Sequence, residues 1–205
     1  MKPRSLFLSG LLVLALGLAT GCNIIPVAQP DVTRYFVLTT AAAKPADAAA
    51  AAPRWKVALR PVDVPSFLRG KAMQVRLAGN EIHFADEARW AEPLEAGLGR
   101  VLRDSLESHG DAVHVVATDG EDPEFAFVVR VLRCEGDREA KVARFAAVVE
   151  VYAPRVSADR RAKDTFTVEV PNWDGTYGQL AQKLSEAVDG LAERMVTLLA
   201  TAEKR

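Results

Sequence analysis

The C-terminal part of the chain carries the pattern that most constrains its fold. Thr176 and Gln179 stand at the spacing of a capping box, which predicts that a helix begins here. The apolar side chains that follow fall on one helical face: Tyr177, Leu180, Leu184, Val188, Leu191, Met195 and Leu198. Because this repeat lasts for only about three heptads, a helix packed on a sheet fits it better than a coiled coil.

The residues before this helix alternate between strand patterns and one more helix. The other helix is expected from Trp90 to His109, where Pro93 suits a first turn and leucines recur on one face. Strands are expected at 35–40, 55–64, 73–77, 81–84, 113–117, 125–132, 142–152 and 165–170. These elements predict one α/β domain over residues 35–201, with a mixed or largely antiparallel sheet and two principal helices packed on it.

Connections between these elements have distinctive sequences. Residues 41–54 are rich in alanine and proline without an amphipathic pattern, so we expect a mobile surface loop. Residues 78–80 supply the turn of a hairpin between the strands at 73–77 and 81–84. Pro61 indicates an edge, a bulge or the end of its strand. The charged residues 135–141 are expected to form a loop between two long strands.

The N-terminus has the layout of a secretory signal. Two basic residues precede an apolar run of about 13 residues, which is shorter than the roughly 20 that a membrane-spanning helix needs. Small residues lead directly to Cys22, and this stretch resembles the lipobox of bacterial lipoproteins, with Ala19 where leucine is usual. Residues 1–21 are therefore predicted to be a signal peptide of the lipoprotein type. An ordinary cleavage that leaves the Cys22 thiol unmodified is the alternative.

Lipidation at Cys22 would anchor the mature chain to a membrane. Two or three acyl chains, palmitate among them, make such an anchor effectively permanent, whereas one chain holds only marginally. Residues 22–34 are expected to be a tether, because Pro26 and Pro30 prevent regular structure. A tether of this length reaches at most about 40 Å, so the domain stays near its own membrane.

The mature chain would carry a small negative charge. Loss of Lys2 and Arg4 with the signal peptide lowers the 26 basic side chains to 24 against 27 acidic ones, a formal charge of −3. The sequence has no basic stripe of the kind that tracks phosphates, so we expect no nucleic acid partner. Cys134 is expected to be a small buried hydrophobe, with a reactive thiol or an intermolecular disulfide as the alternatives.

Signals of catalysis are thin. The histidines His83, His109 and His114 form no pair at a metal-ligand spacing, and the nucleophile and phosphate-loop motifs are missing from the sequence. Gly97 and Gly99 lie inside the expected helix, where they form no nucleotide-binding turn. We therefore expect no catalytic residue, no metal site and no cofactor, and the chain is predicted not to be an enzyme.

Apolar residues near loops are candidates for contact with a partner. Phe67 and Leu68 lie in the connection 65–70, where they either are exposed for a partner or fold back as a lid on the core. Trp90 and Trp173 flank the starts of the two expected helices and are expected to pack on the core, as hydrophobic staples do.

Three motifs, in this order along the chain, resemble one known family. They are Tyr35-Phe36-Val37-Leu38, then Val62-x-Val64-Pro65-x-Phe67-Leu68, and Arg89-Trp90-Ala91-Glu92-Pro93-Leu94 at the entry to the first long helix. The chain thereby resembles the PqiC/YmbA-type lipoproteins, also called ABC-type transport auxiliary lipoproteins. The third motif is the most specific, and the Ala-rich loop is a departure that concerns only a connection.

The resemblance implies a non-catalytic role in the cell envelope. It implies a periplasm-facing, lipid-anchored docking component that works with an MCE-domain protein and its inner-membrane transport complex in moving lipids or other hydrophobic molecules. The ring form of MCE assemblies makes a homo-oligomer a further expectation. Asn23 is not the aspartate that favours inner-membrane retention in enterobacteria, so the outer membrane is expected. A lipid-binding carrier of the envelope is the alternative function.

Overall fold

A computed structural model describes residues 30–40, 53–110, 112–117, 122–155 and 157–204. The predicted signal peptide, Cys22 and most of the Ala/Pro-rich loop lie outside the described residues. Residues 33–205 form one compact unit that holds every member of the hydrophobic core, so this segment is expected to fold by itself. Within the part of the chain that the structure describes, every helix is too short or too polar to cross a membrane.

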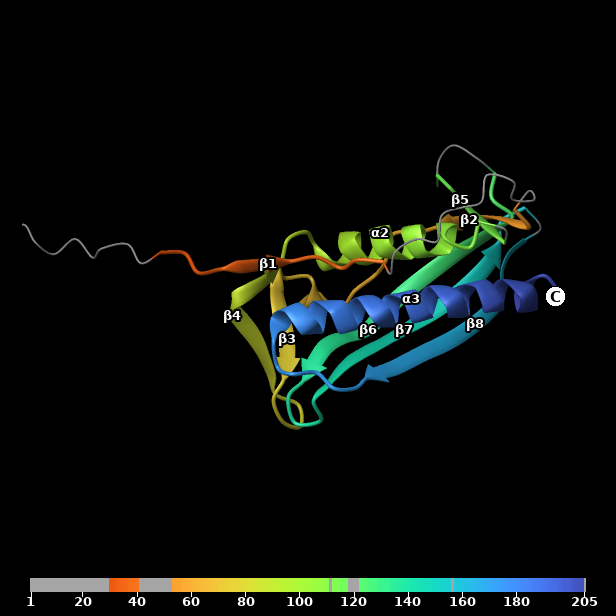
Figure 1. Cartoon of the computed structure of the whole chain (residues 1–205). Coiled ribbons are helices and arrows are strands. Elements are labelled where there is room, and N and C mark those ends of the chain that lie inside the picture. The colour runs from red at the N-terminus through yellow and green to blue at the C-terminus, as the bar shows by residue number, and fades with distance from the viewer. Residues whose placement is uncertain (1–29, 41–52, 111, 118–121, 156, 205) are drawn as a thin grey trace, which may run out of the picture. The chain divides into compact units, whose positions relative to one another are not determined.

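Eight strands form one open, mixed sheet (Figure 1). They are β1 (Arg34–Phe36), β2 (Trp55–Leu59), β3 (Ala72–Arg76), β4 (Ile82–Trp90), β5 (Val113–Val116), β6 (Phe125–Asp137), β7 (Val142–Ala153) and β8 (Ser157–Val170). Their order is β1-β4-β3-β6-β2-β5, with β7 on the other edge of β6 and β8 beyond it. Antiparallel pairs join β3 to β4 and β6 to β7 to β8, and the remaining pairs are parallel. The predicted mixed sheet is confirmed.

Strand β6 organises the sheet because both of its edges are used. One edge pairs with β7 along its length. The other edge pairs with β2 near Phe127 and with β3 near Gly136. The segment between β2 and β3 pairs with β6 through a single β-bridge from Asp63 to Arg130. It then forms the short 3-10 helix η1 (Ser66–Leu68). The expected strand at 55–64 therefore ends at Leu59, just before Pro61.

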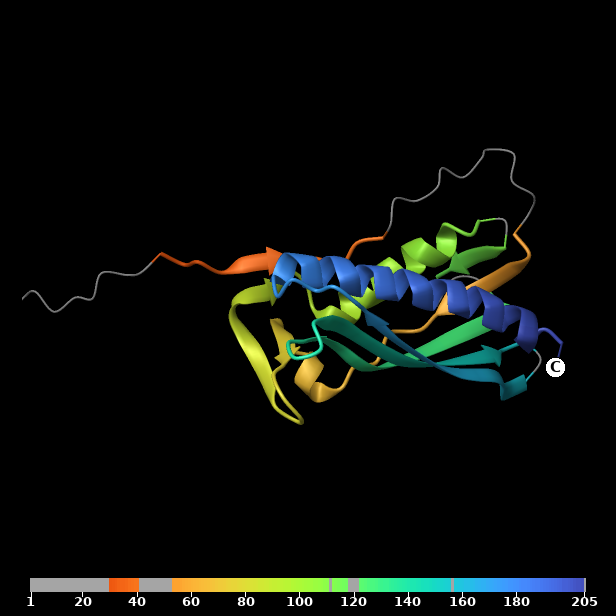
Figure 2. The ribbon, with the colours of Figure 1, turned by 60° about the horizontal axis from the view of Figure 1, so that its bottom comes forward.

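Two helices cover one face of the sheet, as Figure 2 also shows: α2 (Leu94–Glu107) and α3 (Tyr177–Ala202). Fully buried leucines from both helices meet aromatic and β-branched side chains of the central strands, and this set forms the core: Leu98, Leu102, Leu184, Leu191, Phe127, Val129 and Phe145. Because the apolar stripe of each helix is continuous, each one buries a single face against the sheet. The predicted pair of principal helices is confirmed.

The start of α3 forms only half of the predicted capping box. The side chain of Thr176 accepts a hydrogen bond from the backbone N–H of Gln179, as expected. The backbone N–H of Thr176, however, donates to the carboxylate of Asp174 at 2.8 Å, and the Gln179 side chain accepts from the N–H of Asp174. Asp174 thus replaces Gln179 in the reciprocal bond.

Several expected boundaries were wrong, among them the start of β8, which lies at Ser157 and not at residue 165. Strand β1 ends at Phe36, because the next residues bond to helices: the Leu38 carbonyl accepts from Arg100 at 2.9 Å, and the Thr39 N–H donates to Ser185 at 3.0 Å. Strand β4 continues to Trp90, whose N–H donates to the carbonyl of Lys71.

Strand β6 also runs further than expected, to Asp137, so the first residues of the predicted charged loop 135–141 belong to the sheet. The Glu135 side chain is completely buried there and pairs with Arg76. A buried, paired carboxylate can continue a strand that its charge alone would have ended.

Candidate functional site

The sheet face that the helices leave open carries an apolar patch, which we define as Phe67, Phe84 and Leu132. These side chains are 40%, 46% and 41% exposed. Phe84 lies opposite Gln74 in the antiparallel β3–β4 pair, so both side chains point to the same face. Gln74 in turn donates from Nε2 to the Phe67 carbonyl at 3.4 Å, which brings η1 to this face.

Leu132 joins the patch because of an irregularity in β6. The register of β6 against β7 shifts between Val131 and Arg133, and the inward-facing Val131 and Cys134 are buried. The two residues between them therefore both point to the open face. Since the chain from the Asp63 bridge to β3 follows β6, η1 lies alongside this irregular stretch.

The two candidate contact residues of the loop 65–70 separate in the structure. Phe67 is exposed, as a contact residue must be, whereas Leu68 is fully buried in the core. In a 3-10 helix successive side chains point about a third of a turn apart, so one residue can face solvent while the next faces inward. The expected exposure of Leu68 was wrong, and its role as a lid on the core is what the structure supports. Cys22 lies outside the described residues.

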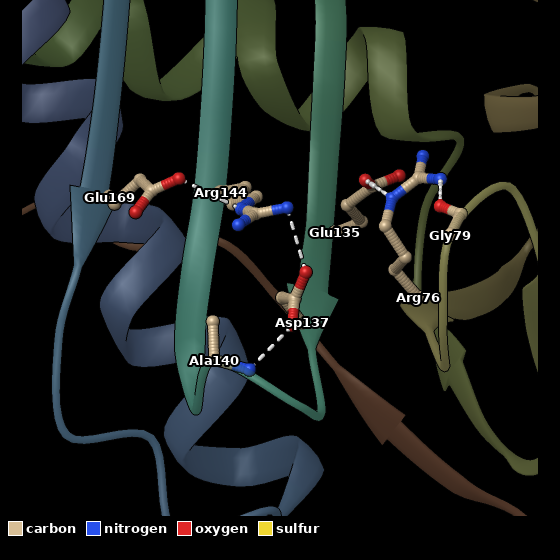
Figure 3. A network of polar contacts seen from close by, with 7 residues as sticks. All are labelled: Arg76, Gly79, Glu135, Asp137, Ala140, Arg144 and Glu169. Carbon is tan, nitrogen blue, oxygen red and sulfur yellow. Dashed lines mark hydrogen bonds and ion pairs between the residues drawn. The ribbon is translucent and has the colours of Figure 1, made fainter.

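A row of opposite charges crosses the same open face (Figure 3). Arg76 pairs with Glu135 at 2.7 Å, and Arg144 pairs with Asp137 at 2.7 Å and with Glu169 at 2.9 Å. The strand register produces this row, because Glu135 lies opposite Arg144 and Arg144 lies opposite Glu169. Cross-strand pairs of opposite charge stabilise a sheet, so the row holds β3, β6, β7 and β8 together at this end.

Two turns are tied to the charged row. The Arg76 guanidinium also donates to the carbonyl of Gly79 in the β3–β4 turn at 2.8 Å. The Asp137 carboxylate also accepts the backbone N–H of Ala140 in the β6–β7 turn at 2.7 Å. The row therefore fixes both hairpin turns as well as the strands.

Two buried acceptors next to the patch lack a donor among the described residues. They are Oε1 of Gln74, which is 1% exposed, and Oε2 of Glu135. Both belong to the adjacent strands β3 and β6 and point to the open face. A buried acceptor without a donor costs about 1–3 kcal/mol. Both atoms are enclosed by the protein, so a partner that binds on the surface of the sheet does not reach them.

The three histidines lie on different elements or connections of the fold. His83 is in β4, His114 is in β5, and His109 follows α2, where its Nδ1 lies 2.9 Å from the Ser105 carbonyl oxygen. Across the described ranges, no group of three or more histidine, cysteine or acidic side chains is placed to hold a metal ion.

Cys134 lies within β6 and is 1% exposed. Burial, with a smaller contribution from the charge of Glu135, raises the pKa of its thiol to about 12. A thiol with such a pKa stays protonated at neutral pH and is a weak nucleophile. The residue is thus the small buried hydrophobe that its position in an apolar strand predicted.

The tryptophans that flank the helix starts both pack on the core, as predicted. Trp90 and Trp173 are each 2% exposed. The Trp173 indole N–H donates to the carbonyl of Thr176 at 2.7 Å, and its ring covers Gly136 so closely that a Cβ there would lie 2.7 Å away. Only glycine fits at this position of β6.

Alternation along the sequence does not reveal the patch. In the strand at 81–84 it groups Phe84 with Ile82 on the apolar face, which predicts burial, whereas Phe84 is 46% exposed. In β6 the irregularity shows only in Arg133, which stands where alternation from Val129 and Val131 would place an apolar residue.

Comparisons with known proteins agree on the fold. The structure is similar to that of protein XCC0632 from Xanthomonas campestris, with 18% identity, a TM-score of 0.67, and coverage of 83% of this chain and 98% of that chain. It is equally similar to the structure of an uncharacterized protein, with 16% identity, a TM-score of 0.67, and coverage of 80% of this chain and 97% of that chain. At such identities the likeness shows a shared fold. A search of curated proteins gave no match.

The sequence itself matches one family over most of its length. Residues 36–196 match the family described as the ABC-type transport auxiliary lipoprotein component. The match includes the end of the first motif noted above and the whole of the other two, together with α2, most of α3 and almost the entire sheet. The chain therefore belongs to the family of ABC-type transport auxiliary lipoprotein components.

Proposed function

We propose that the protein is a non-catalytic docking component of an MCE-type system that moves lipids or other hydrophobic molecules between membranes. Membership in the auxiliary lipoprotein family supports an accessory role in the cell envelope. The MCE-domain partner follows from the resemblance of the three motifs. We further propose that Cys22 carries the lipid anchor and, given Asn23, that the anchor lies in the outer membrane.

The observation that carries this proposal is the exposed apolar patch on the open face of the sheet. Phe84 and Leu132 lie on strands and Phe67 lies in η1, which the Gln74 side chain ties to β3. Aromatic side chains are enriched where protein interfaces gain most of their binding energy. The partner segment must therefore supply apolar side chains for the patch.

The length of the tether limits how far the domain can move from its membrane. The domain begins at β1, and the residues between Cys22 and Arg34 reach at most about 40 Å. The anchored domain therefore stays near one membrane, and transport across the periplasm requires a partner that spans the gap.

A photocrosslinking experiment in the native bacterium tests the docking. A photoreactive phenylalanine analogue replaces Phe84 or Phe67, and the crosslinked proteins are identified by mass spectrometry. Tyr35 is the matched control, because it is also aromatic and is 60% exposed in β1, outside the patch. We expect an MCE-domain protein from the patch positions and not from Tyr35. Recovery of no MCE protein, or equal recovery from Tyr35, would sink the proposal.

The anchor is tested separately. Labelled palmitate should enter the wild-type chain and not the Cys22→Ser variant, and the variant should leave the membrane fraction. A variant that still takes up palmitate and still sediments with membranes would overturn Cys22 as the lipidated residue.

The alternative, a carrier that encloses an acyl chain between α3 and the sheet, has less support. The interface between α3 and the sheet is filled by side chains, since Leu180, Leu184 and Leu191 are fully buried there. An acyl chain would have to displace them. Native mass spectrometry of residues 33–205 distinguishes the two functions, because a carrier retains a zwitterionic phospholipid such as phosphatidylethanolamine by its acyl chain and a docking component does not.

A further inference from the structure

A cavity of about 670 Å³ lies away from the apolar patch, at the loops 138–142 and 171–175. The first loop is the β6–β7 turn, and the second connects β8 to α3. Its lining is mixed in charge and polarity: Arg138, Ala140, Lys141, Val142, Pro171, Asn172, Trp173, Asp174 and Gly175. The proposed docking at the apolar patch does not involve this cavity.

The backbone of both loops is fixed in uncommon conformations. Among the described residues, Lys141 and Asn172 are the two non-glycine residues with positive φ, at 54° and 62°, and both line the cavity. A backbone bond from the Trp173 N–H to the Lys141 carbonyl, 2.9 Å long, joins the loops. Residues with positive φ persist where the surrounding structure holds them, so the cavity walls are preformed.

The cavity carries two basic side chains, and the surrounding surface also holds acidic ones, since Arg138, Asp86 and Glu87 all act on the pKa of Tyr177. Within the described part of the chain, no acidic side chain lies within ion-pair distance of Arg138 or Lys141. The one acidic side chain of the lining, Asp174, accepts hydrogen bonds from the N–H and the hydroxyl of Thr176, and these bonds hold its pKa below the usual range. With this carboxylate charged and occupied, the lining keeps a net positive charge.

The floor of the cavity is apolar and rigid. Trp173 is 2% exposed, its ring lies against Gly136, and its indole N–H is bound to the Thr176 carbonyl. A cavity with a buried aromatic floor and two cationic side chains at its exposed rim suits an amphiphilic anion better than a bare ion.

The cavity lies near β1, the first strand of the domain. The second loop leads into the first turn of α3, where Gly178 lies beside the ring of Phe36 in β1. Figures 1 and 2 both show β1 next to the beginning of α3. Basic side chains near the point of attachment are attracted to anionic lipid head groups.

We propose that this cavity binds the phosphate group of an anionic lipid head group in the membrane that carries the anchor, with Arg138 and Lys141 as its ligands. The bound head group gives the domain a second membrane contact and orients it. This inference rests on the proposed anchor at Cys22 only for the source of the lipid, and it is independent of docking to an MCE protein.

Vesicle binding of the purified segment 33–205 tests the site without the lipid anchor. The segment is sedimented with vesicles of phosphatidylcholine that contain phosphatidylglycerol, and with vesicles of phosphatidylcholine alone. We expect binding only to the anionic vesicles, and a loss of about 30-fold in the double variant Arg138→Gln/Lys141→Gln, since each basic side chain near an anionic surface contributes roughly a factor of five. Equal binding to both kinds of vesicle would overturn the proposal.

The matched control removes the same charge elsewhere. Lys71 and Arg133 are exposed and do not line the cavity. The variant Lys71→Gln/Arg133→Gln should bind anionic vesicles nearly as the unmodified segment does. An equal loss in both double variants would mean general attraction of a basic surface, which contradicts a specific site. Circular dichroism checks that each variant is folded.

A second measurement separates a lipid from a soluble phosphate compound. The indole N–H signal of Trp173 is followed by NMR as glycerol 3-phosphate is added, with the signals of Trp55 and Trp90 as internal references. A shift of Trp173 together with binding to anionic vesicles supports the site. A shift of Trp173 without binding to anionic vesicles would overturn the membrane as the source of the phosphate group. If glycerol 3-phosphate causes no shift and the vesicles do not bind, the site itself is overturned. Crosslinking from Phe84 reports on another face, so it can fail without changing these results.

Discussion

The two faces of the sheet are stabilised by different interactions. The face under α2 and α3 is covered by fully buried leucine, valine and phenylalanine side chains. The open face is instead held by ion pairs between neighbouring strands, with an apolar patch beside them. Burial of apolar surface is the larger source of stability, whereas the net gain from a buried ion pair is small because desolvation offsets the attraction. We therefore expect the helix face to determine stability and the open face to determine recognition.

The largest effect is expected from Leu184→Ala, on the helix face. Leu184 is fully buried between α3 and the sheet, so its truncation leaves a cavity and lowers the free energy of unfolding by about 3 kcal/mol. Urea denaturation of residues 33–205 measures this loss. Gln182→Ala on the exposed side of α3 is the control, with a change near zero. A loss as small as that of the control would mean that the helix face does not carry the stability.

The next largest effect is expected from Arg76→Ala, which tests whether the open face also contributes to the free energy of unfolding. Arg76→Ala leaves the fully buried Glu135 carboxylate without its partner, and breaking a buried pair costs about 3 kcal/mol at most in this partly open setting. Arg160→Ala, which removes an exposed partner of Glu150, should cost well under about 1 kcal/mol. Equal losses in the two variants, measured by urea denaturation, would show that the buried pair has no special weight.

A smaller effect concerns the pH dependence of the link between α3 and β8. The hydrogen bond from Arg194 lowers the pKa of Asp164 in the folded protein. A lowered folded-state pKa means that stability is present above the unfolded pKa and is lost as the pH falls through the folded pKa. Because both side chains are partly solvated, the contribution is under about 1 kcal/mol. Asp164→Asn should flatten the stability curve below about pH 4, and an unchanged curve would contradict this link.

The smallest effect on stability is expected from Phe84→Ala, in the patch. Phe84 is 46% exposed, so its loss should change the free energy of unfolding by about 0.5 kcal/mol. Recovery of the MCE-domain protein from crosslinked envelopes should nevertheless fall strongly. A variant that is unstable but still recovers the partner would reverse the roles assigned to the two faces.

The helix face could be predicted from the sequence because its signals are local. The repeat from Tyr177 to Leu198 and the leucines after Pro93 each identify a helix, its buried side and its start. The hairpin of β3 and β4 was equally accessible, since turn residues separate two short alternating strands. Local patterns of this kind need no knowledge of which strands are neighbours.

The open face could be predicted only in part, because it depends on register. The charge of Glu135 predicts a loop. Its place in a strand depends on Arg76 and Arg144, which lie on the two adjacent strands and are distant in the sequence. Leu68 looked as exposed as Phe67, and the 3-10 turn that separates them has no clear sequence signature. The cavity near Trp173 joins two loops that are far apart in the sequence, so no motif marks it.

The short segment after β1 has a mechanical consequence. Phe36 accepts a backbone bond from Ala91, the Leu38 carbonyl is held by Arg100 of α2, and the Thr39 N–H is held by Ser185 of α3. Leu38 is itself buried in the core. Tension on the N-terminal end of the domain is thus distributed over β4 and both helices before it can reach the loop at 41–54. A pull from the membrane would load β4 and both helices together, and because β4 also carries Phe84, the load would reach the apolar patch.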